Sequence, residues 1–208
     1  MAFKKLSIAS GKASGTNINM PLLVIPSEIT NLGTLTLAEA QSSRFYSDEA
    51  KTTELAREIV SADEIHVKVP SVTTSTTIYI DYDGVRSDYA TDATYGTENV
   101  WSDYAYVSHD GGLTDSTGNG GDGTAFGTPT IVTGKIGNGT LINADSEGYE
   151  IADNTAMQLQ FPITISYWIN ATVFGQAFYT DSWGVENTGY NGVRASISAS
   201  GYYVATGA

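Results

Sequence analysis

Apolar and polar side chains alternate in steps of two along several short stretches of this chain, and this period limits the fold more than any other feature. In EIHVKVP, Ile65, Val67 and Val69 alternate with His66 and Lys68. Successive side chains of a β-strand point to opposite faces, so such a stretch has one apolar and one polar face. TTIYIDYDG repeats the pattern and ends in an Asp-Gly turn. The sequence therefore predicts half-buried antiparallel strands, with His66 on a solvent-facing side.

The rest of the sequence favours the same class. The 208 residues include 22 glycines, 13 tyrosines and only five prolines, which suits short strands and tight turns better than helices. A helix is the alternative in SDEAKTTELAREIV, but its threonines and thin apolar stripe favour a turn at 48–51 followed by a strand. We expect a central strand in PITISYWINATVF and a hairpin that turns at Ser200 and Gly201 in VRASISASGYYVAT.

Composition excludes several kinds of site. Cysteine is absent from the sequence, so disulfides and thiolate metal sites are excluded. No apolar run approaches the roughly 18 residues of a membrane span. The apolar patch near the N-terminus is too short for the core of a signal peptide. We therefore expect no membrane insertion and no N-terminal secretion signal.

Charge limits the partners. The formal net charge is −13, and residues 99–208 contain ten acidic but only two basic side chains. Nucleic acid is not an expected partner, because so few basic groups are available to neutralise phosphates. Calcium or a neutral or basic surface suits this charge better, and solubility alone is the simpler explanation.

The segment DSTGNGGDGT, residues 115–124, has three interpretations. Its glycines spell G-x-G-x-x-G, but no helix can begin in the following TAFGTPTIV, so phosphate binding is not supported. Carboxylate and amide oxygens are calcium ligands, and the candidates here are Asp110, Asp115, Asn119 and Asp122. Asp115 and Asn119 can instead brace a turn through hydrogen bonds to the backbone, while glycines adopt positive φ. We favour the turn and keep calcium as the alternative.

Several motifs carry a resemblance to a known family. FKKLSIASGKASGTNINMPLLVIP, RFYSDEAKTTELAREI and HVKVPSVTTSTTIYIDYDG resemble, in this order, the uncharacterised β domain that often precedes a laminin-G-like jelly roll. VWSDYAYVSHDGGLTDSTGNGGDGT, GKIGNGTLINADSEGYEIAD and FPITISYWINA are similar to the first half of that concanavalin A-like jelly roll. Val85 departs from the family, which usually has an asparagine there.

The resemblance implies an all-β chain with two domains. An N-terminal antiparallel β-sandwich domain is expected at 1–86, a linker at 87–99, and a concanavalin A-like (laminin-G-like) jelly roll at 100–208. The later tryptophan-histidine-valine strand of such a jelly roll is missing, so we expect an incomplete one. Either residues beyond 208 complete it, which we favour, or another chain does so by strand addition.

Catalysis finds little support in the sequence. The alternating Glu-Asp-Glu strand of concanavalin A-like glycosidases does not occur, and neither does a G-x-S-x-G elbow. His109 lies next to Asp110 in the sequence and could form an acid-base pair with it, but a structural hydrogen bond is the simpler interpretation.

Glycan binding fits one aromatic stretch. Rings near carboxylate and amide groups suit sugar recognition, because a ring stacks on a pyranose while polar groups bind its hydroxyls. FYTDSWGVENTGYNG, which we expect to form a loop, supplies six candidates: Tyr179, Asp181, Trp183, Asn187, Tyr190 and Asn191. The alternative is that Trp183 and Tyr190 pack in a core or clasp a hairpin.

These features lead us to expect a non-enzymatic structural and adhesion protein of a bacteriophage virion, such as a head fibre, capsid decoration protein or tail fibre. Virion proteins assemble in the host cytoplasm and need no leader. The expected partners are other virion proteins, with a homo-oligomer as one arrangement, and host-surface glycans. The alternatives are a module of a bacterial secreted or cell-surface glycan-binding protein, or accessory domains of a larger glycan-processing enzyme.

Overall fold

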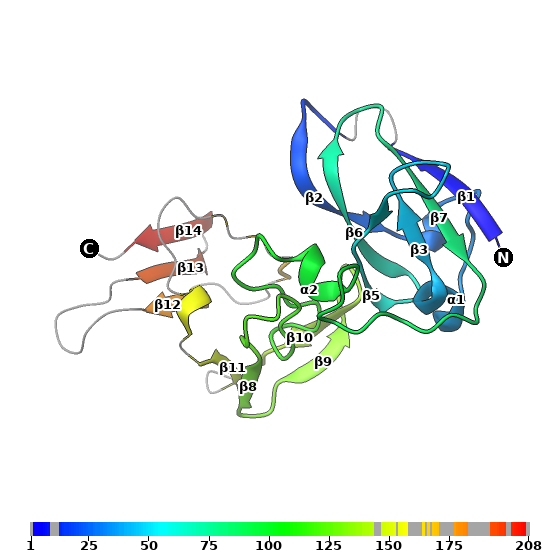
Figure 1. Cartoon of the computed structure of the whole chain (residues 1–208). Coiled ribbons are helices and arrows are strands. Elements are labelled where there is room, and N and C mark those ends of the chain that lie inside the picture. Colours follow the sequence, from blue (N-terminus) through cyan, green and yellow to red (C-terminus); the bar gives the residue numbers. More distant parts are fainter. Residues whose placement is uncertain are drawn as a thin grey trace. The chain divides into compact units, whose positions relative to one another are not determined.

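The structure is a computed structural model in which the chain forms two compact units, Met1–Ile151 and Ala152–Ala208 (Figure 1). It describes residues 2–8, 13–143, 147–152, 154–157, 164, 166 and 168–170, and the backbone of three strands at 177–182, 192–198 and 201–206. With 36% strand and 10% helix, the chain is mostly β and its sheets are antiparallel, which confirms the expected all-β class.

Two antiparallel sheets form the first part of the first unit (Figure 1). One has the order β1-β7-β3-β4, with β1 at Ala2–Ser7, β7 at Thr77–Tyr82, β3 at Arg44–Tyr46 and β4 at Glu54–Leu55. The other has the order β2-β6-β5, with β2 at Asn17–Val24, β6 at Glu64–Val72 and β5 at Arg57–Ser61. The turn at 48–51 followed by strands is therefore confirmed, and no helix forms there.

Both sheets contribute to one apolar core. Ile65, Val67 and Val69 of β6 are at most 3% exposed, and they pack in the same cluster as Ile78 and Ile80 of β7. These are the residues that the alternation places on apolar faces. Full burial of such a side chain stabilises the fold by about 1.5 to 3 kcal/mol, so this interior is the main source of stability in this part of the chain.

Short helices complete the first unit. A 3₁₀ turn spans Pro26–Glu28, and α1 spans Leu37–Ser42. Thr36 and Glu39 form a capping box at the start of α1, in which each side chain binds the other residue's backbone N–H. A second helix, α2, spans Thr97–Val100.

The polar face of β6 is also covered, which corrects the expectation that His66 faces solvent. His66 is 9% exposed, because α2 lies against β5 and β6 and the residues after it continue across the same face. The expected linker, residues 87–99, lies within the first unit. It is held there by Arg57, whose backbone N–H donates to the Tyr95 carbonyl and whose guanidinium binds Asp88 at 2.6 Å.

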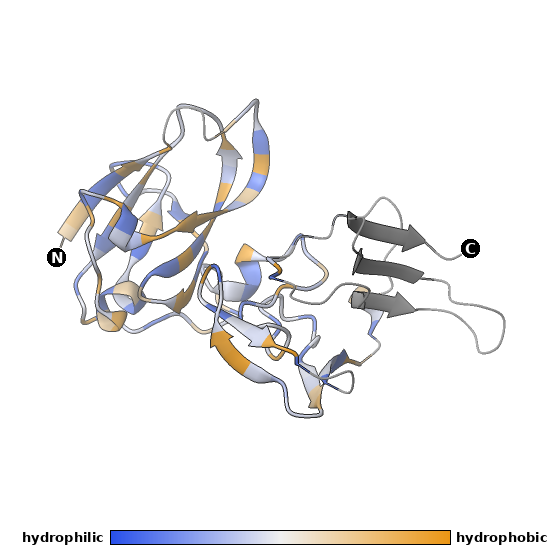
Figure 2. Ribbon diagram, turned by 180° about the vertical axis from the view of Figure 1, so that it is seen from behind, coloured by the Kyte–Doolittle hydropathy of each residue, from blue (hydrophilic) through white to orange (hydrophobic). Residues whose placement is uncertain are grey.

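Four further strands of the first unit form two small antiparallel sheets. One pairs β8 with β11, and the other pairs β9 with β10. Their bounds are Gly123–Phe126 for β8, Thr130–Thr133 for β9, Asn138–Leu141 for β10 and Gly148–Ile151 for β11. Ile131 and Val132 make β9 apolar (Figure 2), and both are exposed.

The second unit contains a 3₁₀ turn, Thr155–Met157, and a sheet in the order β12-β13-β14. These strands are Ala177–Ser182, Gly192–Ser198 and Gly201–Thr206. Ser198 pairs with Gly201, which confirms the expected hairpin, although Gly201 begins β14 and is not part of the turn. Of the central strand expected in PITISYWINATVF, the structure describes residues 164, 166 and 168–170, and none of these is in a strand. Among the described residues, no helix has the length and apolarity needed to cross a membrane.

Candidate functional site

Two histidines and two glutamates form a buried cluster, which we call the His-Glu cluster: Glu58, Glu64, His66 and His109. Glu58 on β5 pairs directly with His66 on β6, so their side chains share one face of the sheet. Glu64 lies two residues before His66 on β6 and therefore points to the same face. His109 reaches the cluster from the segment that follows α2.

His109 lies between the two carboxylates. Its Nε2 is 2.9 Å from Oε2 of Glu58, and its Nδ1 is 3.4 Å from Oε1 of Glu64. The same Glu64 oxygen is 3.3 Å from Nε2 of His66. The two imidazole rings stack with their centroids 4.4 Å apart and their planes 25° from parallel. Both carboxylates thus interact with a histidine on a face that excludes most water.

Trp101 and Ser116 complete the surroundings of Glu58. The indole Nε1 of Trp101 donates to Oε2 of Glu58 at 2.6 Å, and the Ser116 hydroxyl donates to Oε1, also at 2.6 Å. The indole ring lies 5.1 Å from the ring of His66 and 5.4 Å from that of His109, measured between centroids. Trp101 is itself only 6% exposed, so the cluster is closed by a large side chain.

The carboxylates and His109 shift one another's pKa strongly. Burial lowers the pKa of His109, but the interactions with Glu58 and Glu64 outweigh burial and raise it to about 9. Burial raises the pKa of Glu64, but the interactions with His109 and His66 outweigh it and lower the value to about 2. The pKa of Glu58 is likewise lowered, because His109, Ser116 and Trp101 together outweigh its burial. At neutral pH the cluster therefore contains an imidazolium between two carboxylates.

Two atoms of the cluster are buried without a hydrogen-bond partner: Nε2 of His109 and Oε2 of Glu64. Although Nε2 is close to Glu58, the pair lacks the alignment of a hydrogen bond. Oε2 of Glu64 lies under Gly137, where an added Cβ would collide with it. Within the described residues, one group of histidine and acidic side chains could share a metal ion: Glu58, His66 and His109. Their ligand atoms lie within 4.8 Å of one another.

The first of the predicted calcium ligands, Asp110, organises the turn that follows it. Its Oδ1 accepts hydrogen bonds from the backbone N–H groups of Gly112, Leu113 and Thr114 at 3.0 to 3.3 Å. It also accepts one from the Ser108 hydroxyl at 2.7 Å. The sequence suggested Asp110 as the partner of His109. In the structure, His109 instead contacts Glu58 and Glu64.

Asp115 and Asp122 brace DSTGNGGDGT from within. The carboxylate of Asp115 accepts from the backbone N–H groups of Val107, Thr117 and Gly121 at 3.0 to 3.3 Å. Asp122 in turn accepts from the backbone N–H of Asp115 at 2.8 Å. These contacts satisfy backbone groups that the irregular loop leaves without strand partners.

Asn119 and two glycines complete the turn. The Asn119 amide donates to the carbonyls of Tyr104 and Ala105, both at 3.1 Å. Gly118 and Gly120 both have φ of +76°, a conformation that glycine adopts without the strain of a side chain. The turn interpretation is confirmed, and calcium at Asp110, Asp115, Asn119 and Asp122 stays a prediction.

The predicted glycan-binding residues fall partly in a strand. Tyr179 and Asp181 belong to β12, opposite Ala195 and Val193 of β13, so the expected loop does not include these two positions. The other four candidates, Trp183, Asn187, Tyr190 and Asn191, lie outside the described residues.

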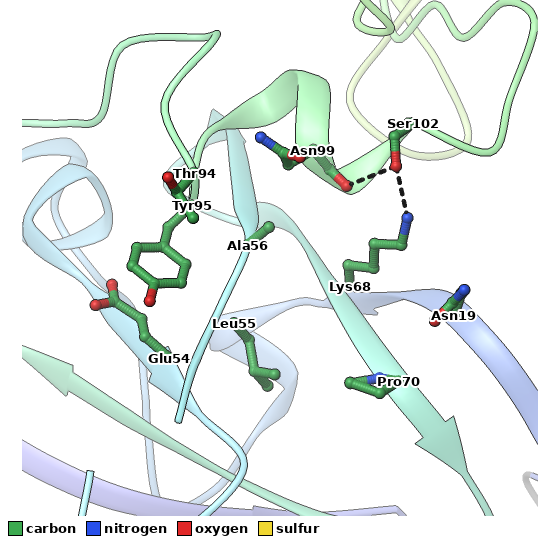
Figure 3. A pocket seen from close by; sticks show the side chains of 10 residues that line it. All are labelled: Asn19, Glu54, Leu55, Ala56, Lys68, Pro70, Thr94, Tyr95, Asn99 and Ser102. Carbon is green, nitrogen blue, oxygen red and sulfur yellow. Dashed lines mark hydrogen bonds between the residues drawn. The ribbon is translucent and has the colours of Figure 1, made fainter. Parts of the chain in front are cut away.

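An open pocket lies beside α2, on the part of β6 that continues beyond the cluster (Figure 3). Its volume is about 260 Å³, and it is lined by Asn19, Glu54, Leu55, Ala56, Lys68, Pro70, Thr94, Tyr95, Asn99 and Ser102. The Lys68 ammonium donates to the Ser102 hydroxyl at 2.8 Å and pairs with Asp103 at 2.9 Å. The one cation that lines it is thus already bound to neighbouring side chains.

The sequence pattern placed His66 on a solvent-facing side and His109 beside Asp110, so it predicted neither histidine in this cluster. Glu58 and Glu64 lie on the two strands of a hairpin. The register of that hairpin, which no sequence motif specifies, brings them together. The available signal was that the chain has only two histidines, each close in sequence to acidic residues. In comparisons with protein-family models, curated proteins and solved structures, none matches this chain.

Proposed function

We propose that this chain is a non-enzymatic structural and adhesion protein of a bacteriophage virion, of the head-fibre, capsid-decoration or tail-fibre type. The observation that carries the proposal is the architecture: antiparallel β units follow one another along the chain. A virion surface protein needs stable modules that hold binding loops in place. β-Sheets that share an apolar core provide such support, because their interiors are closely packed.

The non-enzymatic part of the proposal is supported by how the ionisable groups are used. His109 and Glu64 have the most strongly shifted pKa values among acids and bases of the His-Glu cluster. The two side chains form an ion pair with each other, and the Trp101 ring packs against His109. A catalytic acid or base must reach a substrate, whereas these groups join β6 to the segment after α2.

The proposed adhesive part is a lectin-like, laminin-G-like jelly roll at 100–208. Support comes from the order of its sequence motifs and from the succession of short antiparallel strands after α2. Host-surface glycans would be bound by the aromatic and polar group of Tyr179, Asp181, Trp183, Asn187, Tyr190 and Asn191. Calcium at the DSTGNGGDGT loop is an additional part of the proposal.

Two experiments test this function. Mass spectrometry of purified virions is expected to find the chain as a stoichiometric component, and its absence from virions would reject the virion role. A glycan array is expected to show binding by the wild type, lost in Trp183→Ala and kept in Trp168→Ala, whose tryptophan is 73% exposed. Repeating the array with a chelator tests calcium. Recovery of the chain from bacterial envelopes instead would favour the surface-protein alternative.

A further inference from the structure

We propose that Glu58, His66 and His109 bind one divalent transition-metal ion, with Zn²⁺ as the best fit, on the buried face formed by β5 and β6. The three side chains offer ligand atoms that lie within 4.8 Å of one another. Imidazole nitrogen combined with carboxylate oxygen is a donor set that Zn²⁺ accepts, whereas Ca²⁺ and Mg²⁺ favour oxygen ligands. The proposal does not depend on the virion role or on calcium binding at the loop.

The two nitrogens of His109 have different surroundings, as in a zinc-bound histidine. Nε2 is buried and lies 2.9 Å from Oε2 of Glu58 without the alignment of a hydrogen bond, while Nδ1 faces Oε1 of Glu64 at 3.4 Å. Histidines that bind zinc through one nitrogen usually donate the other N–H to a carboxylate or carbonyl, which fixes the tautomer and the ring orientation. Nε2 is thus the ligand atom, and Glu64 is the positioning residue.

Glu58 is similarly held by donors around it. Trp101 and Ser116 each donate a hydrogen bond to one of its oxygens at 2.6 Å. Contacts of this kind fix the direction of a ligating carboxylate and are typical of metal sites in proteins. The same donors reduce the freedom that the side chain would lose when it binds an ion.

Charge also favours a divalent cation at this position. Glu58 and Glu64 are 7% and 3% exposed, and buried carboxylates need compensating charge. One Zn²⁺ with two neutral imidazoles balances the two carboxylates completely.

The position of the cluster indicates a structural ion rather than a catalytic one. Trp101 packs against both histidine rings and is 6% exposed, so a large side chain covers the position of the ion. Glu58 and His66 come from the β5–β6 hairpin, and His109 comes from the segment after α2, which is distant from that hairpin in the sequence. The three ligands come together only in the folded chain, so the ion stabilises the folded state and its binding free energy becomes folding free energy.

The test uses the full chain without a histidine tag, stripped of metal with a chelator and titrated with ZnCl₂ by calorimetry. We expect one Zn²⁺ per chain, a rise in Tm of several degrees, and reversal by chelator. The chain has only two histidines, so NMR can follow both imidazoles, and zinc should shift both sets of signals. Co²⁺ should give the intense visible absorption of a low-symmetry site and lose it when Zn²⁺ is added.

Variants separate this site from adventitious binding. Glu58→Gln and His109→Gln should abolish stoichiometric binding, and Glu64→Gln should weaken it by about 10- to 100-fold, as for a group that orients a ligand. Glu150→Gln is the matched control, because Glu150 is exposed on β11 and should leave binding unchanged. If a variant does not fold, the wild-type NMR and Co²⁺ measurements still decide. Absence of stoichiometric binding by the wild type, or binding that leaves the histidine signals unshifted, overturns the proposal.

Discussion

His109 is the residue through which pH acts most directly on this fold. In the metal-free protein, burial lowers the pKa of His109, but Glu58 and Glu64 outweigh burial and raise it to about 9. The unfolded chain has a histidine pKa near 6.5, so the folded chain binds this proton more tightly. The stabilisation is complete below about pH 6.5 and is lost as the pH rises to about 9. In chelator, urea unfolding should show a loss on the order of 2 kcal/mol across this interval.

His109→Gln is the control for that alkaline loss. It removes the titrating group, so the free energy of unfolding should be lower below pH 6.5 and should vary much less between pH 6.5 and 9. An undiminished alkaline loss in this variant would assign the effect to another group.

Glu64 determines the acid side of the same profile. Burial raises its pKa, but His109 and His66 outweigh burial and lower it from 4.5 to about 2. A lowered pKa in the folded state means that this stabilisation is present above pH 4.5 and is lost as the pH falls toward 2. Glu64→Gln should therefore reduce the acid dependence of unfolding measured in urea between these values. Glu64→Gln removes the titrating carboxylate. If the free energy of unfolding of this variant still fell between pH 4.5 and 2 as in the wild type, another group would be responsible.

Arg57 is a second residue on which packing depends. It is 1% exposed, and its guanidinium donates to the carbonyls of Ser43 and Gln41 at 2.7 and 2.8 Å and to Asp88 at 2.6 Å. Lysine cannot supply this fork of donors. Arg57→Lys should therefore lower the free energy of unfolding by about 2 to 4 kcal/mol, measured by urea denaturation. Arg86→Lys, at a side chain 28% exposed that pairs with the buried Asp81, should cost less than Arg57→Lys, and equal losses would contradict the argument.

At the level of elements, the DSTGNGGDGT loop depends on Asp115. Asp115→Ala removes the acceptor of hydrogen bonds from Val107, Thr117 and Gly121. Leaving such donors without a partner costs about 1 to 3 kcal/mol, which thermal unfolding can measure. The loss should be the same with and without chelator if the carboxylate acts as a turn brace. A loss seen only when calcium is present would instead support the calcium interpretation.

The strands show what sequence can and cannot predict. The alternation in β6 and β7 correctly assigned Ile65, Val67, Ile78 and Ile80 to the apolar core. The same alternation placed His66 on a solvent-facing side, because periodicity records side-chain polarity and not what later parts of the chain cover. Here polar residues are buried because other polar residues neutralise them. The start of α1 has a local sequence signal, the capping box T-x-x-E of Thr36 and Glu39.

The candidate site was harder to predict than the fold for a related reason. Its residues are brought together by the register of β5 and β6 and by the return of the chain after α2. Neither the pairing register nor that return leaves a motif in the sequence. The predicted calcium ligands are acidic and amide residues that are close in sequence, and in the structure they form a turn. The metal-like arrangement instead joins two facing positions of the β5–β6 hairpin to His109, which is far from them along the chain.

At the scale of the whole molecule, the fragment 1–151 should fold independently, because the first compact unit ends at Ile151. Trp101 is the only tryptophan among these residues, so its fluorescence reports unfolding of the cluster's cover. We expect one cooperative urea transition for this fragment.

The fragment 1–86 matches the domain expected from the sequence and lacks the residues that cover the His-Glu cluster, Trp101, His109 and Ser116. The remaining cluster residues, Glu58, Glu64 and His66, would then be exposed to solvent. This shorter fragment should be less stable by more than about 2 kcal/mol, measured by circular dichroism in urea. Equal stability of the two fragments would instead make residues 87–99 a linker between independent domains.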